Sequence, residues 1–170
     1  HLIYEGTKAE NILVTGIPVR QQFLNMDRKH QENEKEVRRV LVMGGGLGLM
    51  PDLRRLLGKL HSMQSVQTIV ITGKNHKMYE EWVNRYEDVK VLGYTENISK
   101  YMRWADLVIT KAGGITLFEI LHSQVPLFVI HPFLEQEMNN ARYAAEKGFA
   151  KVVWGKHEDY IPELEKLLND

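Results

Sequence analysis

Two glycine-rich segments of the chain are suited to hold an anionic ligand. Residues 44–48 (GGGLG) follow one apolar run, and residues 111–114 (KAGG) follow another. Glycines let the backbone approach a ligand closely, and the N–H groups at the start of a following helix attract phosphate. The alternative is a tight strand-to-helix turn that binds nothing. The first segment is not a dinucleotide fingerprint, because Leu49 stands where the third glycine is needed.

Two side chains after the second glycine segment are candidates for holding a ribose. Thr116 and Glu119 are three residues apart and share a face of the predicted helix. A carboxylate in this place could accept hydrogen bonds from two neighbouring hydroxyls. The same Thr-x-x-Glu spacing is that of a capping box, which only satisfies the helix's own N–H groups. From spacing alone, the cap is the favoured interpretation.

Polar side chains also open the helix that is expected after residue 130. Gln136 and Glu137 could bind the hydroxyls of a sugar. Acidic side chains are favourable at a helix start for electrostatic reasons alone, so this pattern has a second explanation. Three isolated histidines are interpreted as ordinary surface or packed residues, namely His76, His122 and His131. No cluster of His, Asp and Glu has metal-ligand spacing and there is no Asp-x-Asp pair, so no metal is expected.

The elements that must position these residues alternate regularly along the chain. Apolar runs occupy residues 11–15, 40–43, 67–72, 89–92, 107–110, 126–130 and 150–153. Between them, apolar residues recur at helical spacing over 53–60, 78–86 and 141–145, with Gly148 as the expected stop of the last helix. The alternation predicts an α/β fold, a Rossmann-like open parallel sheet with helices on both faces.

Topology alone therefore locates the expected ligand site. In open α/β sheets a ligand lies at the carboxyl ends of the strands. The segments expected to surround it are 44–48, 72–76, 93–98, 111–116 and 131–137.

Composition and charge argue against several classes of protein. The 170 residues are enough for a single domain, 1–170, and the 22 basic and 22 acidic side chains cancel, so no nucleic-acid partner is expected. The absence of cysteine excludes disulfides and fits a reducing, cytoplasmic compartment. No apolar run approaches the roughly 20 residues that span a bilayer, so any membrane contact is expected to be peripheral. Residues 21–39 are polar, with a charge run at 31–36, and we interpret them as a solvated loop.

Taken in order, the segments resemble a known family. The matching stretches are 16–20 (GIPVR), 44–48, 72–75 (TGKN), 91–94 (VLGY), 105–116 (ADLVITKAGGIT) and 135–141 (EQEMNNA). They resemble the C-terminal domain of the monogalactosyldiacylglycerol synthases and processive diacylglycerol glucosyltransferases. More distantly, the chain is similar to the N-acetylglucosaminyltransferase that completes lipid II. The resemblance covers residues 11–153, approximately, and it implies one half of a GT-B fold, the N-terminal acceptor domain being absent from this chain.

The resemblance also implies a role for each matching position. Tyr94 would flank uracil, the backbone of Thr95 would pair with its edge, and Glu119 would bind the ribose hydroxyls, which now outweighs the cap. The remaining contacts would be Arg20 near the nucleotide, Gly45, Gly46, Gly113, Gly114 and Thr116 at the diphosphate, and Gln136 and Glu137 at the hexose. Gly46 stands where the lipid II enzyme usually has serine.

The implied activity is inverting hexosyl transfer without a covalent intermediate. UDP-glucose or UDP-galactose would be the donor substrate, no cofactor is expected, and the acceptor would be a lipid of the diacylglycerol type. The catalytic base is expected on the absent domain. The full-length enzyme is expected to be cytoplasmic and to contact the inner face of the membrane peripherally.

Three other functions remain open at this point. An enzyme similar to UDP-N-acetylglucosamine 2-epimerase would bind the same nucleotide, but the acidic and histidine residues it needs cannot be located here. A non-catalytic nucleotide-sugar-binding module is the second. A methyltransferase that uses S-adenosylmethionine would fit the glycines of 44–48, but residues 72–75 (TGKN) provide no acid for its ribose.

Overall fold

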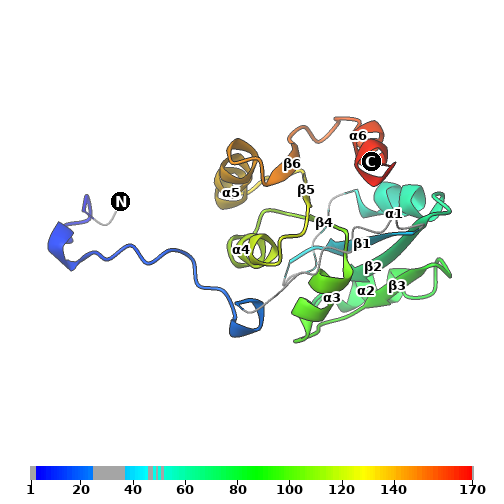
Figure 1. The fold of residues 1–170 in the computed structure, drawn as a ribbon, viewed down its shortest axis with the longest axis horizontal. Helices are drawn as coiled ribbons and strands as arrows, with labels where there is room; N and C mark the ends of the chain where they lie inside the picture. Colours follow the sequence, from blue (N-terminus) through cyan, green and yellow to red (C-terminus); the bar gives the residue numbers. More distant parts are fainter. Residues whose placement is uncertain (1–2, 25–36, 46–47, 49, 51, 170) are drawn as a thin grey trace.

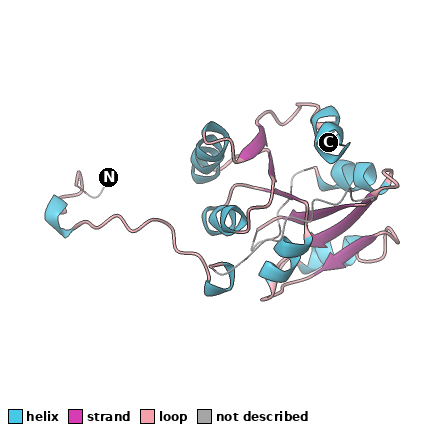
Figure 2. Ribbon diagram, viewed as in Figure 1, coloured by secondary structure: helices cyan, strands magenta, loops and turns pink. Residues whose placement is uncertain are grey.

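The computed structural model describes residues 3–24, 37–45, 48, 50 and 52–169. Their strands form one sheet in which every pairing is parallel, in the order β3-β2-β1-β4-β5-β6 (Figures 1 and 2). The strands are β1 (Arg38–Met43), β2 (Val66–Ile71), β3 (Val89–Leu92), β4 (Leu107–Thr110), β5 (Leu127–Ile130) and β6 (Ala150–Val153). The predicted Rossmann-like fold is confirmed.

Helices cover both faces of the sheet. They are α1 (Leu53–His61), α2 (His76–Trp82), α3 (Ile98–Trp104), α4 (Gly114–His122), α5 (Glu135–Glu146) and α6 (Ile161–Asn169). The apolar side chains of α1, α2 and α6 pack together on one face, and those of α3, α4 and α5 pack on the other. Because successive side chains of a strand point to opposite faces, Val42 of β1 joins the first cluster and Leu41 the second. This explains why the strands are apolar almost throughout.

From β1 the sheet is extended on one side by β2 and β3, and on the other side by β4, β5 and β6. The chain leaves β1 towards α1 on one face and leaves β4 towards α4 on the other. The two connections diverge, so a crevice opens at the carboxyl ends of these strands. The described glycines that follow β1 and β4 lie at this point, namely Gly44, Gly45, Gly113 and Gly114.

The predicted strand at residues 11–15 is wrong. The structure has a short 3-10 helix at Ala9–Asn11, and the residues after it belong to no strand. Leu13 and Val14 are 84% and 90% exposed, and this part of the chain runs away from the domain (Figure 1). An apolar run becomes a strand only when a neighbouring strand takes up its N–H and C=O groups, and no strand of the described sheet reaches it.

The segment 21–39, interpreted as a solvated loop, also needs correction. Gln21–Phe23 forms a 3-10 helix, and Phe23 is 1% exposed among the side chains of α3 and α4. The charge run at 31–36 lies outside the described residues. Of the predicted helices, α1 buries all four of its leucines, whereas α2 ends at Trp82 rather than continuing to residue 86. The stop at Gly148 is confirmed by its φ of 71°.

Candidate functional site

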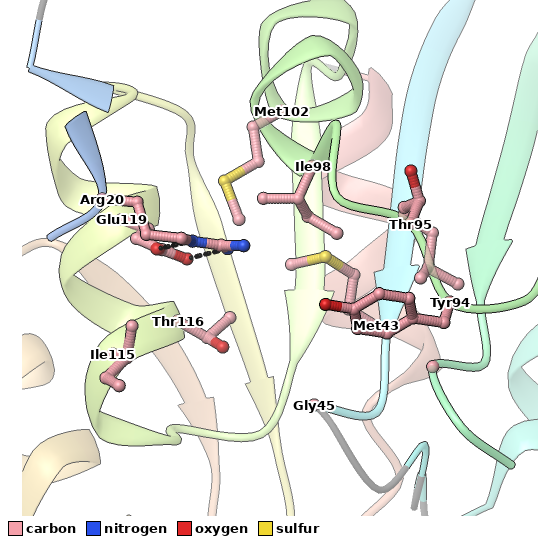
Figure 3. Close-up of a pocket in the computed structure, with 12 residues that line it drawn as sticks. Arg20, Met43, Gly45, Tyr94, Thr95, Ile98, Met102, Ile115, Thr116 and Glu119 are labelled. Carbon is pink, nitrogen blue, oxygen red and sulfur yellow. Dashed lines mark hydrogen bonds and ion pairs between the residues drawn. The ribbon is translucent and has the colours of Figure 1, made fainter. Parts of the chain in front are cut away.

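A pocket of about 260 Å³ lies at the crevice between β1 and β4 (Figure 3). Its floor is apolar, with Met43 from the end of β1 and Ile98 and Met102 from α3. The other lining residues are Arg20, Gly45, Ile71, Gly73, Tyr94, Thr95, Ile115, Thr116 and Glu119. Six residues named from the sequence as nucleotide contacts thus meet in one cavity, namely Arg20, Gly45, Tyr94, Thr95, Thr116 and Glu119, although their contacts to a ligand stay a prediction.

Glu119 is a buried carboxylate on the α4 wall of the pocket. It is 1% exposed, and Arg20 donates to both of its oxygens, from Nε to Oε1 at 2.6 Å and from an Nη atom to Oε2 at 2.8 Å. This hydrogen-bonded ion pair raises the pKa of Arg20. The pair neutralises a charge that burial would otherwise penalise, and it fixes the plane of the carboxylate at the cavity.

The segment that carries Arg20 is fastened to the opposite wall as well. The amide of Gln22 accepts a hydrogen bond from the Ser99 hydroxyl at 2.8 Å and donates one to the Glu96 carbonyl at 3.2 Å. The guanidinium of Arg20 also lies 5.4 Å from the ring centre of Phe23. Residues 20–23 therefore bridge α3 and α4 along one side of the pocket.

An aromatic ring borders the pocket across from Glu119. Tyr94 and Thr95 follow β3, and Figure 3 shows them on the side opposite Arg20 and Glu119. The Tyr94 ring is 62% exposed, with the Lys74 ammonium 5.8 Å from its centre. An exposed ring of this kind offers a flat apolar face on which a planar base can stack.

The cap interpretation of Thr116 is wrong. Helix α4 begins at Gly114 with Gly113 as its N-cap, so Thr116 lies in the first helical turn and cannot be the cap. Glycine has no side chain to cap the helix, and the first N–H groups of a helix have no partner within it. These donors open towards the cavity beside Gly45 and Thr116, which suits an anion.

A second pocket of about 360 Å³ adjoins the first, and the two share Gly45, Ile115 and Thr116. Its other lining residues are Gly44, Lys111, Gly113, Gly114, Phe133, Leu134, Gln136 and Glu137. The start of α4 therefore lies between the two cavities, and the pair predicted from the sequence to bind sugar lies in the second.

Glu137 has two structural roles in this second pocket. Its carboxylate accepts from the backbone N–H of Phe133 and of Leu134 at 3.3 and 3.4 Å, which caps α5. It also lies 3.2 Å from the ammonium of Lys111. These contacts give the acid a structural reason to stand at the start of α5, and a contact to a sugar stays a prediction. Both N–H groups bond to Oε2, so Oε1, the oxygen near Lys111, is the one that can still accept a further hydrogen bond.

Lys111 is the residue of the site that sequence reasoning missed. It is 6% exposed, and its ammonium lies 4.0 Å from the centre of the Phe133 ring. The signal was present, since the lysine opens the KAGG segment, but the interpretation used only the glycines. A buried ammonium beside the start of α4 adds positive charge where a phosphate is expected.

Gln136 lies directly over the start of α4. Its Nε2 is 3.1 Å from the point that a side-chain carbon on Gly114 would occupy, and Nδ2 of Asn140 is 3.7 Å from the same point. A side-chain carbon at Gly114 would therefore require the Gln136 amide to shift by a few tenths of an ångström. Gln136 itself is exposed, with its amide at the second pocket.

The glycines after β1 serve two different purposes. At Gly48 a side-chain carbon would lie 1.9 Å from the carbonyl oxygen of Thr72, so this glycine lets the loop pass the end of β2. At Gly45, with φ of 71°, a side-chain carbon would meet nothing within 4 Å, because the residue faces the pockets. Gly46, also predicted to contact diphosphate, lies outside the described residues.

The described part of the chain has neither a candidate metal site nor a membrane-spanning helix. Within it, no group of three or more His, Cys, Asp and Glu side chains could hold a metal ion. Within the same residues, no helix is long and apolar enough to cross a membrane.

The chain matches known proteins both in sequence and in fold. Residues 39–169 match the model of the glycosyltransferase family 28 C-terminal domain. Over 99% of its length the chain is 34% identical to the processive diacylglycerol β-glucosyltransferase of Bacillus licheniformis and 33% identical to that of Bacillus subtilis. It spans 46% of each of these relatives, about half their length.

Solved structures share the fold at lower identity. MurG of Acinetobacter baumannii superimposes with a TM-score of 0.70 at 19% identity, over 87% of this chain and 46% of that one. A putative UDP-N-acetylglucosamine 2-epimerase from Listeria monocytogenes gives 0.65 at 18%, over 99% of this chain and 47% of that one. At these identities the likeness shows the fold alone.

Proposed function

The chain belongs to the glycosyltransferase family 28 C-terminal domain family, and from this premise we propose that it is the donor-binding half of a UDP-sugar-dependent inverting hexosyltransferase with a lipid acceptor. The relatives that it matches are about twice as long, so acceptor binding and the catalytic base belong to the other half of such an enzyme. UDP-glucose or UDP-galactose is the donor substrate, and the reaction uses no cofactor.

The observation that carries the proposal is the pair of adjoining pockets that share Gly45, Ile115 and Thr116. A nucleotide-sugar consists of two bulky parts joined by a diphosphate. Two cavities joined at a helix start match that division, because the start of α4 offers N–H donors to the diphosphate between them. A site for a nucleotide alone would need only the first pocket.

Each part of the donor has chemically suitable partners. Uracil stacks on or beside Tyr94 and pairs with the backbone of Thr95. The ribose hydroxyls donate to Glu119, whose oxygens keep acceptor capacity after binding Arg20. Gln136 and Glu137 bind the hydroxyls of the hexose. The diphosphate lies against Gly45, Gly113, Gly114 and Thr116, and Gly46 is expected to contact it as well.

This half of the enzyme would assist catalysis by stabilising the leaving group. In inverting transfer, an acceptor oxygen bonds to the anomeric carbon as the bond to the UDP oxygen breaks, and the negative charge collects on the diphosphate. The N–H groups at the start of α4 and the ammonium of Lys111 are fixed before the reaction begins. Preorganised donors of this kind stabilise the transition state without reorganising.

The lipid acceptor is inferred from the relatives. The two Bacillus proteins named above are diacylglycerol glucosyltransferases, and they match this chain from end to end. The full-length enzyme would then work on the inner face of the membrane, held there peripherally through its acceptor half.

Binding and transfer measurements on the 170-residue chain test the proposal. We expect calorimetry to detect UDP and UDP-hexose binding, with no competition from NAD or S-adenosylmethionine. We expect no sugar transfer to diacylglycerol by this chain alone. Failure to bind any uridine nucleotide would overturn the donor-site proposal, and turnover by the isolated chain would overturn the division of labour between the two halves.

A further inference from the structure

A third pocket, of about 410 Å³, shares no lining residue with the two described above. Asp52 and Arg55 line it from the start of α1, His131 from the end of β5, and Lys156 and His157 from the loop after β6. It thus lies at the carboxyl edge of the sheet, on the face that α1 and α6 cover (Figure 1).

His131 is buried in the wall of this pocket without a polar partner. It is 6% exposed, and neither of its ring nitrogens has a hydrogen-bond partner among the residues that the structure describes. Burial lowers the pKa of His131. A buried imidazole with neither nitrogen bonded is costly, so a ligand that bonds to it would recover free energy.

The backbone holds His131 in this unfavourable place. Its φ is 47°, a left-handed conformation that a residue with a side chain rarely adopts. The His131 N–H donates to the Val153 carbonyl at 3.0 Å, and the Tyr160 ring lies edge-on at 6.0 Å. Backbone strain of this kind persists where the surrounding structure imposes it, and strained residues are frequent at ligand-binding sites.

The start of α1 also lacks its usual side-chain cap. Asp52 is the N-cap residue, but its side chain bonds to no N–H group of the helix. Its carboxylate instead accepts from the Tyr160 hydroxyl at 3.2 Å. The first N–H donors of this nine-residue helix are therefore left without a cap at the pocket.

The charged side chains around the pocket are nearly balanced, since Asp52 and Asp159 oppose Arg55 and Lys156. Arg55 is paired with Asp159 and lies 3.8 Å from Asp52, which balances it. Lys156 and His157 are exposed, and in the described part of the chain no hydrogen bond or ion pair is found for either. Among the described residues, the groups here that lack partners are the Lys156 ammonium, the His131 imidazole and the first N–H groups of α1, and such donors suit an oxyanion better than a cation or an apolar molecule.

We infer that this pocket binds an oxyanion of the phosphate class, held by the His131 imidazole, the Lys156 ammonium and the free N–H groups at the start of α1. His131 supplies a directional N–H donor, and the Lys156 ammonium supplies positive charge. The ligand is either free phosphate or the head of a phosphate monoester, since both present the same oxygens. The inference does not depend on the donor site.

Imidazole NMR spectra of the ¹⁵N-labelled 170-residue chain test the inference. Inorganic phosphate is titrated in, and His131→Gln identifies the His131 signals. We expect the His131 and His157 signals to move saturably, and sodium chloride at equal ionic strength not to reproduce the movement. Glycerol 3-phosphate is titrated in parallel: tighter binding than phosphate identifies a monoester as the ligand, and weaker binding identifies the free anion.

Lysine variants give the matched control. Lys156→Ala should weaken phosphate binding about three-fold, as expected for one exposed charge. Lys147 is another exposed lysine, at the end of α5, and Lys147→Ala should bind phosphate as the native chain does. An unmoved His131 signal, equal affinities of the two variants, or a His131 signal that moves with UDP but not with phosphate would each overturn the inference.

Discussion

Arg20 and Glu119 are 99 residues apart in the sequence, and their side chains form two parallel hydrogen bonds of 2.6 and 2.8 Å at the edge of the first pocket (Figure 3). The guanidinium uses one acceptor position on each carboxylate oxygen, and each oxygen keeps another. The Glu119 carboxylate is thereby held buried and aligned before any ligand arrives. A carboxylate prepared in this way matches two adjacent hydroxyls of a ribose.

Removing the Glu119 carboxylate should reveal whether it binds the ribose. We expect Glu119→Ala to weaken UDP binding by at least about 1.5 kcal/mol, the scale of hydrogen bonds to a charged group. It should weaken the binding of 2′-deoxy-UDP much less, because that ligand already lacks one of the hydroxyls. Calorimetry with both ligands on both proteins measures the difference.

A second acidic residue controls for the loss of charge alone. Glu163 pairs with Lys151 at 2.7 Å and lines none of the described pockets. Glu163→Ala should therefore leave UDP affinity unchanged. If Glu119→Ala weakened UDP and 2′-deoxy-UDP equally, the carboxylate would act only on the structure of the pocket.

The fold could be predicted well because its determinants are local. Six of the seven apolar runs are strands, since a strand buried on both faces must be apolar along its length. The run at 11–15 has the same local pattern and fails, because pairing with another strand is not a local property. The prediction of a solvated loop at 21–39 fails for the opposite reason. Phe23 is one aromatic residue in a polar stretch, and it packs in the core with side chains of α3 and α4.

The candidate site was predictable as a location and only partly as a set of contacts. Parallel strands end at one edge, so the segments after them had to meet, and Tyr94, Thr116 and Glu119 do line one cavity. Spacing could not show that α4 begins at Gly114, two residues before Thr116. The Lys111–Glu137 pair joins two segments far apart in the chain, and no periodicity in the sequence indicates such a contact.

Gly48 should be the most sensitive glycine of the first loop for folding. Its φ is 62°, and a side-chain carbon would overlap the Thr72 carbonyl oxygen at 1.9 Å. We expect Gly48→Ala to lower the free energy of unfolding by about 2–4 kcal/mol, because a strained backbone and an overpacked contact are added together. Urea denaturation measures the change.

Gly58 is the matched control for this substitution. It lies inside α1, where a side-chain carbon would make only an ordinary contact with the Tyr86 hydroxyl at 3.8 Å. Gly58→Ala should raise the free energy of unfolding by up to about 1 kcal/mol, since alanine is the better helix former. Equal effects of the two substitutions would contradict the role assigned to Gly48.

Tyr160 should make the stability of the domain depend on alkaline pH. The ring is 1% exposed, and burial next to Asp52 raises the pKa of Tyr160. The fold therefore favours the protonated phenol. Its contribution is fully present below the ordinary tyrosine pKa of about 10 and is lost as the pH rises above that value.

Tyr160→Phe separates this effect from the other alkaline titrations. At about pH 8 the variant should be less stable by roughly 1 kcal/mol, because the hydrogen bond to Asp52 is gone. Above about pH 10 its stability should fall less steeply than that of the native chain. Tyr4→Phe, at a residue that is 97% exposed, should follow the native curve. Parallel curves for Tyr160→Phe and the native chain would show that the phenol does not titrate with unfolding.

Gln136 and Glu137 should distinguish a nucleotide-sugar from a nucleotide. Both side chains line the second pocket, whereas Tyr94 and Glu119 line the first. We expect Gln136→Ala and Glu137→Ala to leave UDP affinity nearly unchanged. Affinity for the UDP-hexose should fall by about 1–3 kcal/mol, because a sugar hydroxyl loses its partner. Calorimetry with UDP, UDP-glucose and UDP-galactose makes the comparison.

Glu137→Ala should also reduce stability, since Lys111 loses its partner and α5 loses its cap. Glu135→Ala is the control, because it removes an acid from the same helix turn outside the pocket. If the acids served only the helix dipole, Glu135→Ala and Glu137→Ala would have equal small effects on stability and none on ligand selectivity. An equal loss of affinity for all three ligands would remove Gln136 and Glu137 from the hexose site. The second pocket would then carry no evidence for a sugar, and the domain would have to be regarded as a nucleotide-binding domain alone.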